Sequence, residues 1–176
     1  MAGEHTGPRV RRHRIAVAAA AGCLALPLLA ACTPAEDRVF GVRVVQGHLV
    51  VDPGRCPDES MDHVSVTTRL NGTETGTWRA DADSTGAKTD QVDTGALAPG
   101  WKAQGEPPVL QEGATYSVRV SAARGDQPHT GAFTVDAAAL TGLGEDRIVR
   151  FSGGKQDGGG TVTLSDYRAQ VQKSCH

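Results

Sequence analysis

Apolar and polar side chains alternate in several short runs along the chain. The runs cover 39–45, 47–51, 63–70, 76–80, 114–122, 131–135, 147–151 and 161–164. A period of two residues places successive side chains on opposite faces of a strand, and turn residues separate most of the runs. Many short strands with frequent turns indicate an all-β, antiparallel, immunoglobulin-like β-sandwich.

The strongest turn signal is Asn71-Gly72, which predicts a hairpin between the runs on either side of it. The polar segment 81–113 is punctuated by glycine and proline and predicts a long loop. Short strand pieces are expected within it near Trp101 and near Val109-Leu110.

Two short helices are predicted near the C-terminus. Asp136 is placed to cap a helix over 137–140, which Gly142 would end. In the last segment, apolar residues recur at helical spacing, namely Leu164, Tyr167, Val171 and Cys175. Ser165 is the expected N-cap of this helix, and extended structure is the alternative for 165–174.

The N-terminal segment has the layout of an export signal. Four arginines between Arg9 and Arg14 precede the uncharged run 15–31, which has 17 residues, many of them alanine, and contains Pro27. A membrane-spanning helix needs about 20 apolar residues. A basic region, a short apolar region and small residues before a polar break are typical of a leader that is removed.

The residues at this break, Leu29-Ala30-Ala31-Cys32, resemble the lipobox of bacterial lipoproteins. In that family the cysteine receives a diacylglyceryl group, the leader is cut before it, and the new N-terminus is acylated. The resemblance implies a signal peptide over 1–31 that is removed and a lipidated N-terminus at Cys32. It also implies a lipid anchor on the extracytoplasmic face of the cell membrane. The polar residues that follow Cys32 make 32–38 the lipidated N-terminus and tether, and the alternating runs after them predict a domain over 39–176.

Two alternatives stay open for the leader. Ala20-Ala21-Gly22-Cys23 is a second candidate lipobox, although it leaves a shorter apolar region. Arg11-Arg12 invites export by the twin-arginine route in place of the general route.

Charge narrows the class of partner. The leader has four arginines and one glutamate, so its charge is +3, and because the whole chain is −2 the remainder is −5. Nucleic acid is not expected as a partner, since its binding needs clustered Lys and Arg. A protein of the cell envelope or a secreted protein is the expected partner.

Two cysteines remain beside the lipobox cysteine. An exported chain enters an oxidising space, so Cys56 and Cys175 are expected to form a disulfide. The alternative is a metal site using Cys175-His176, but no second cluster of Cys or His at ligand spacing supports it.

The segment from Leu110 to Val120 resembles the tyrosine corner of fibronectin type III domains. In that family a leucine lies six residues before a tyrosine, and Leu110 and Tyr116 keep this spacing. The family's tyrosine hydroxyl folds back onto the backbone. The resemblance covers about 25 residues and implies a fold, with no activity.

Candidate chemistry in the sequence is sparse. Asp81-Ala82-Asp83-Ser84-Thr85-Gly86 resembles the first half of a calcium loop, and Asp90 could add a carboxylate, but the expected bidentate glutamate is replaced by Val92. No local frame for a catalytic triad is present. The sequence therefore predicts a non-enzymatic binding or interaction module without a cofactor, and a lipoprotein that binds a small ligand or a metal is the alternative.

Overall fold

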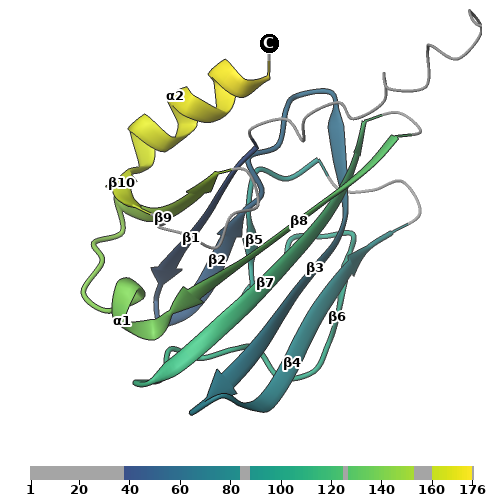
Figure 1. Cartoon of the computed structure of the whole chain (residues 1–176). Coiled ribbons are helices and arrows are strands. Elements are labelled where there is room, and N and C mark those ends of the chain that lie inside the picture. Colours follow the sequence, from purple (N-terminus) through teal and green to yellow (C-terminus); the bar gives the residue numbers. More distant parts are fainter. Residues whose placement is uncertain (1–37, 84–87, 125–126, 153–159, 176) are drawn as a thin grey trace, which may run out of the picture. The chain divides into compact units, whose positions relative to one another are not determined.

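A computed structural model of the protein describes residues 38–83, 88–124, 127–152 and 160–175. They form two five-stranded antiparallel sheets with one short helix and one longer helix. The first sheet has the order β10 (Gly160–Thr163), β9 (Arg147–Ser152), β1 (Val39–Val45), β2 (His48–Asp52) and β5 (Val92–Asp93). The second has the order β6 (Trp101–Gln104), β4 (Thr73–Ala82), β3 (Glu59–Leu70), β7 (Ala114–Arg124) and β8 (Gln127–Asp136). The predicted all-β sandwich is confirmed (Figure 1).

The two sheets bury a single main core between them. Its largest side chains are Trp78, Tyr116, Phe133, Leu49 and Met61, each at most 2% exposed. Phe133 stacks on Phe151 with ring centroids 4.3 Å apart, which joins β8 to β9 across the sandwich. Trp78 and Trp101 both belong to this core, so neither forms a surface platform.

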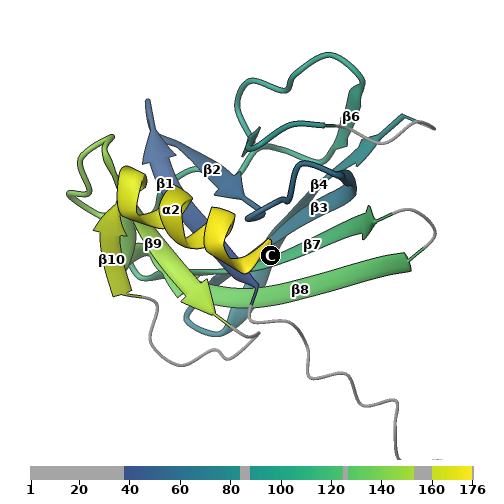
Figure 2. The same cartoon turned by 90° about the horizontal axis from the view of Figure 1, so that it is seen from above.

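The outer face of the first sheet is covered by helix α2 (Leu164–Ser174). Phe40 and Val149 face the main core, whereas Val39 and Ile148, the residues that precede them, face the helix and pack on Tyr167. Figure 2 shows α2 lying across β1, β9 and β10. This second, smaller core explains why β1 and β9 are apolar on both faces. Among the described residues, no helix has the length and apolar character needed to cross a bilayer.

Two tight turns each consist of a residue followed by glycine, and both residues have a positive φ. Asn71 and Gly72 have φ angles of 51° and 79°, and Gln46 and Gly47 have 51° and 83°. Two consecutive residues with positive φ form the two-residue hairpin turn that matches the twist of antiparallel strands. The predicted hairpin at Asn71-Gly72 is confirmed, and a second one joins β1 to β2.

Both helices are present, with capping that differs from the prediction. Thr163, and not Ser165, caps α2, because its hydroxyl accepts a hydrogen bond from the Asp166 amide at 3.1 Å. Asp136 precedes α1 (Ala137–Leu140), but its carboxylate makes no capping hydrogen bond and accepts one from the Thr115 hydroxyl instead. The expected long loop contains two strands, β5 and β6, of which only the one at Trp101 was predicted.

Candidate functional site

The predicted disulfide between Cys56 and Cys175 is formed. It joins the segment after β2 to the C-cap of α2 across a sequence separation of 119 residues. The Cys175 sulfur is therefore engaged, and the metal site proposed for Cys175-His176 loses that ligand. The lipobox residues Leu29, Ala30, Ala31 and Cys32 lie outside the described residues, as does Cys23.

Tyr116 lies at the start of β7 with its ring in the core. Its hydroxyl donates a hydrogen bond to the Val109 carbonyl at 2.8 Å and accepts one from the Gln111 amide at 2.9 Å. Leu110 packs against the main core between these two contacts. The hydroxyl thus holds the segment that enters β7.

The three candidate carboxylates of the acidic segment do not come together. Asp81 pairs with the His63 Nδ1 at 2.7 Å, and Asp90 pairs with Arg55 at 2.8 Å. Asp83 lies at the end of β4, where its amide donates to the Gly100 carbonyl. Within the described part of the chain, no three His, Cys, Asp or Glu side chains are placed to hold a metal ion.

The outer face of the second sheet is polar and is formed by residues that face one another across the strands. Thr67 contacts Thr77, and Ser117 contacts Thr134, through their hydroxyl oxygens at 3.2 and 3.4 Å. Val109, 61% exposed, is the one large apolar side chain that is exposed among the described residues. The described part of the chain therefore exposes no extended apolar patch of the kind that marks a protein-binding surface.

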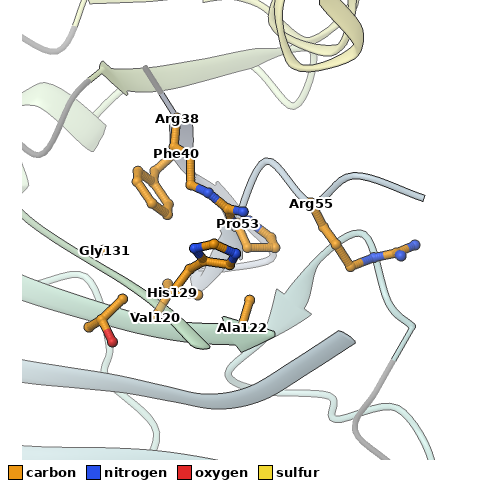
Figure 3. Close-up of a pocket in the computed structure, with 9 residues that line it drawn as sticks. Arg38, Phe40, Pro53, Arg55, Val120, Ala122, His129 and Gly131 are labelled. Carbon is orange, nitrogen blue, oxygen red and sulfur yellow. The ribbon is translucent and has the colours of Figure 1, made fainter. Parts of the chain in front are cut away.

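A small cavity of about 10 Å³ lies between the sheets beside β8. His129 projects into this space toward Pro53 (Figure 3). Its Nε2 is buried without a hydrogen-bond partner among the described residues. The volume is close to the smallest that holds one water molecule, so the cavity is too small for a ligand.

A much larger cleft of about 490 Å³ lies between α2 and the segment that follows β2. This volume falls within the range of small-molecule sites, about 300–1,000 Å³. The residues that line it are Asp52, Arg55, Pro57, Asp90, Tyr167, Arg168, Val171, Gln172 and Cys175. The cleft therefore combines both signs of charge with an apolar wall that includes the disulfide.

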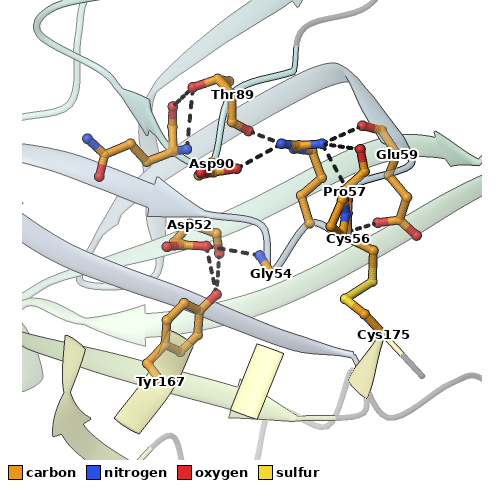
Figure 4. A network of polar contacts seen from close by, with 11 residues as sticks. Asp52, Gly54, Cys56, Pro57, Glu59, Thr89, Asp90, Tyr167 and Cys175 are labelled. Atoms are coloured by element: carbon orange, nitrogen blue, oxygen red, sulfur yellow. Dashed lines mark hydrogen bonds and ion pairs between the residues drawn. A yellow bond between two sulfur atoms is a disulfide. The ribbon is translucent and has the colours of Figure 1, made fainter. Parts of the chain in front are cut away.

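Asp52 is a buried carboxyl group in the wall of this cleft, only 9% exposed. Its Oδ1 accepts hydrogen bonds from the Gly54 amide at 3.0 Å and from the Tyr167 hydroxyl at 2.9 Å. Figure 4 shows the Tyr167 ring pointing toward Asp52. Burial raises the pKa of Asp52, and the two hydrogen bonds oppose that rise.

Arg55 also lines the cleft, and its side chain links several segments around it. Its guanidinium donates to the carbonyls of Thr89, Cys56 and Glu59 and pairs with Asp90. Most of its donors are therefore used by the protein itself. The Arg55 guanidinium thus has little capacity left for a ligand, whereas the side chain of its partner Asp90 is 85% exposed.

We expect an alkaline loss of stability that depends on Tyr167. Burial, followed by the nearby Asp52 charge, raises the pKa of Tyr167 well above its ordinary value of 10.0. Above about pH 10 an unfolded tyrosine loses its proton while folded Tyr167 keeps it, so the folded state binds more protons. The free energy of unfolding then falls by about 1.4 kcal/mol per pH unit for this group until the folded pKa is passed.

The measurement is urea unfolding of the protein and of Tyr167→Phe at several values between pH 9 and 12. The variant should show a shallower fall with pH, whatever its stability at pH 7. Tyr116, whose pKa burial also raises, stays in both proteins and serves as the internal reference. Equal slopes for the two proteins would contradict the buried position of the Tyr167 hydroxyl.

Gly54 is required by the turn that carries Asp52 to the cleft. Its φ is +60°, and a Cβ at this position would overlap the Val39 carbonyl oxygen. We expect Gly54→Ala to lower the free energy of unfolding by about 2 kcal/mol, from the strained φ and the clash together. Gly47→Ala is the matched control, because its φ is +83° with nothing within 4 Å, and should lose about 1 kcal/mol. Equal losses in chemical denaturation would contradict the close packing at Gly54.

Of the cleft residues, the sequence singled out Asp90 as a candidate calcium ligand and Cys175 for the disulfide, but not Asp52, Arg55 or Arg168. Asp52 stands just beyond the predicted strand over 47–51, and Tyr167 was an apolar position of the last helix. Their contact spans 115 residues, so only the pairing of the first sheet with α2 brings them together. Comparison with protein-family models, curated proteins and solved structures gave no match to this chain.

Proposed function

We propose that the protein is a lipoprotein that Cys32 anchors to the extracytoplasmic face of the cell membrane, where its sandwich acts as a non-enzymatic binding module. The observation that carries this proposal is the sequence Leu29-Ala30-Ala31-Cys32 at the end of a basic and then apolar leader. A cysteine carrying diacylglycerol and an acyl chain gives durable anchoring, since each buried methylene contributes about 0.8 kcal/mol.

The length of the tether supports this arrangement. Arg38 is the sixth residue after Cys32, and an extended chain spans at most about 3.6 Å per residue. Arg38 would then lie within about 22 Å of the anchor. Since Arg38 contacts Glu59 at the start of β3, and Glu59 contacts Cys56, the tether would join the sandwich at the end that carries the disulfide.

We assign the sandwich to the immunoglobulin-like class. In that class strands C, F and G form one sheet, A, B and E are neighbours in the other, and a tyrosine at the start of F bonds back to the backbone. The orders β3-β7-β8 and β1-β2-β5 support this assignment, and Tyr116 makes such bonds at the start of β7. Both features concern the fold and leave the activity open.

The cleft favours a small ligand over a large protein surface. It is concave, has a buried carboxyl group in its wall and lies on a scaffold that the disulfide cross-links. The second sheet instead offers a polar face without an exposed apolar centre, which is a poor match to the buried core of a stable protein interface. We therefore place the binding site of the module in the cleft.

Replacement of the anchor cysteine tests the proposal. The unaltered protein should fractionate with membranes and incorporate a fatty-acid analogue, whereas Cys32→Ser should lose the label and leave the membrane fraction. Cys23→Ser is the matched control and should behave as the unaltered protein. Continued labelling of Cys32→Ser, together with loss of label from Cys23→Ser, would move the anchor to Cys23.

A further inference from the structure

We propose that the cleft beside α2 binds a small zwitterion, a molecule that carries an ammonium and a carboxylate group close together, as in a free α-amino acid or a dipeptide. The inference rests on the proposed binding function and names its ligand class. Two opposite charges that line one concave site carry the proposal, namely those of Asp52 and Arg168.

Asp52 supplies the negative end. Oδ1 is fixed by the Gly54 amide and the Tyr167 hydroxyl, so the orientation of the carboxyl group is set before any ligand arrives. Oδ2 accepts no hydrogen bond from the described residues. A buried carboxylate with a free oxygen in the wall of a cleft favours a ligand with a cationic donor. Charge-assisted hydrogen bonds are the strongest that such an oxygen can accept.

Arg168 supplies the positive end. It follows Tyr167 on α2, and its side chain is exposed and lines the same cleft. Within the described ranges it forms no hydrogen bond or ion pair, although its charge favours the ionised form of Asp52 through space. A guanidinium with unused donors binds a carboxylate through two parallel hydrogen bonds.

The remaining cleft residues limit the ligand further. Arg55 pairs with Asp90, whose side chain is 85% exposed, so Asp52 and Arg168 are the charged side chains of the cleft that form no ion pair within the described residues. Val171, Pro57 and the Cys175 sulfur form an apolar wall beside these charges. An uncharged aliphatic side chain fits that wall, and the cleft has room for one or two residues.

Titration calorimetry on the purified full-length chain in detergent tests the inference. The probes are L-leucine and L-alanyl-L-alanine, with leucine amide lacking the carboxylate and N-acetyl-leucine lacking the ammonium. We expect saturable binding of leucine, of the dipeptide or of both, and binding of leucine amide and N-acetyl-leucine at least about tenfold weaker than that of the tighter zwitterion. Leucine or the dipeptide binding more tightly distinguishes a free amino acid from a peptide ligand. No binding of either zwitterion, or binding of leucine amide or N-acetyl-leucine as tight as that of leucine, overturns the proposal.

Two variants assign the charges. Asp52→Asn should weaken zwitterion binding by at least about tenfold, and Arg168→Gln should do the same while leaving the weak binding of leucine amide unchanged. Arg119→Gln, an exposed arginine on β7, is the control and should bind as the unaltered chain. Arg168 is exposed, so its variant stays informative even if Asp52→Asn unfolds. Unchanged affinity in Arg168→Gln overturns the proposal, whereas fractionation of Cys32→Ser reports on anchoring independently.

Discussion

Removal of the disulfide by the double substitution Cys56→Ala and Cys175→Ala is expected to lower the free energy of unfolding by about 4 kcal/mol. The bridge closes a loop with a sequence separation of 119 residues, so it removes much of the freedom of the unfolded chain. It also fixes the C-terminal end of α2, whose other anchor is the buried Tyr167. Urea unfolding of the full chain in detergent measures the loss.

The double substitution leaves neither partner of the bridge as an unpaired thiol, so a lone Cys56 or Cys175 cannot exchange with other cysteines and confuse the result. The unaltered protein unfolded in a reducing agent is the matched control and should show the same loss as the double variant. A loss below about 1 kcal/mol in both experiments would contradict a structural role for the bridge.

Glu59→Gln is expected to lower the free energy of unfolding by about 3 kcal/mol. The Glu59 side chain is fully buried, and its Oε1 pairs with Arg38 and lies 3.4 Å from the Arg124 guanidinium. Its Oε2 accepts a hydrogen bond from the Cys56 amide at 3.0 Å. Removing the negative charge leaves Arg38 largely buried without a counter-charge, and breaking such a pair costs about 3–5 kcal/mol.

Asp58→Asn is the matched control for Glu59→Gln. Asp58 pairs with the same Arg124 at 3.1 Å, but its side chain is 62% exposed, and an exposed ion pair contributes about 0–1 kcal/mol. The second test is Arg38→Gln combined with Glu59→Gln, which should be less destabilising than the sum of the single changes. A loss of unfolding free energy in the double variant equal to the sum of the two single losses would contradict the coupling of the Arg38 and Glu59 side chains.

The sandwich could be predicted because a strand that buries one face has alternating apolar and polar residues. Residues 114–122 alternate through Tyr116, Val118 and Val120, and each of these is buried in the main core. The spacing of Leu164, Tyr167 and Val171 predicted α2 for the same reason, since these three face the smaller core. Local periodicity reports burial well where one face of an element is covered.

The errors came from residues whose role depends on distant partners. β3 begins at Glu59, four residues before the predicted start, because Arg38 and Arg124 allow a glutamate to be buried there. β5 consists of two residues and is recognisable only through its pairing with Val50 and Val51. A strand this short has no periodicity of its own to detect.

The cleft was hidden from the sequence for a related reason. Asp52 and Arg168 are far apart in the chain, and neither stands in a motif with a characteristic spacing. Cys56 and Cys175 gave the nearest signal, since their predicted disulfide brings the end of α2 to the segment after β2. The predicted bridge therefore joined the two segments that flank the cleft, but it indicated neither the cleft nor the charges that line it.

The mass of the mature protein extracted from membranes tests the central claim most directly. The account predicts a chain that begins at Cys32, carries a diacylglyceryl group on that residue and contains an intact bridge between Cys56 and Cys175. Fragmentation should place all of the lipid mass on the first residue. A mature chain that begins elsewhere, or one that begins at Cys32 without lipid, would contradict the account.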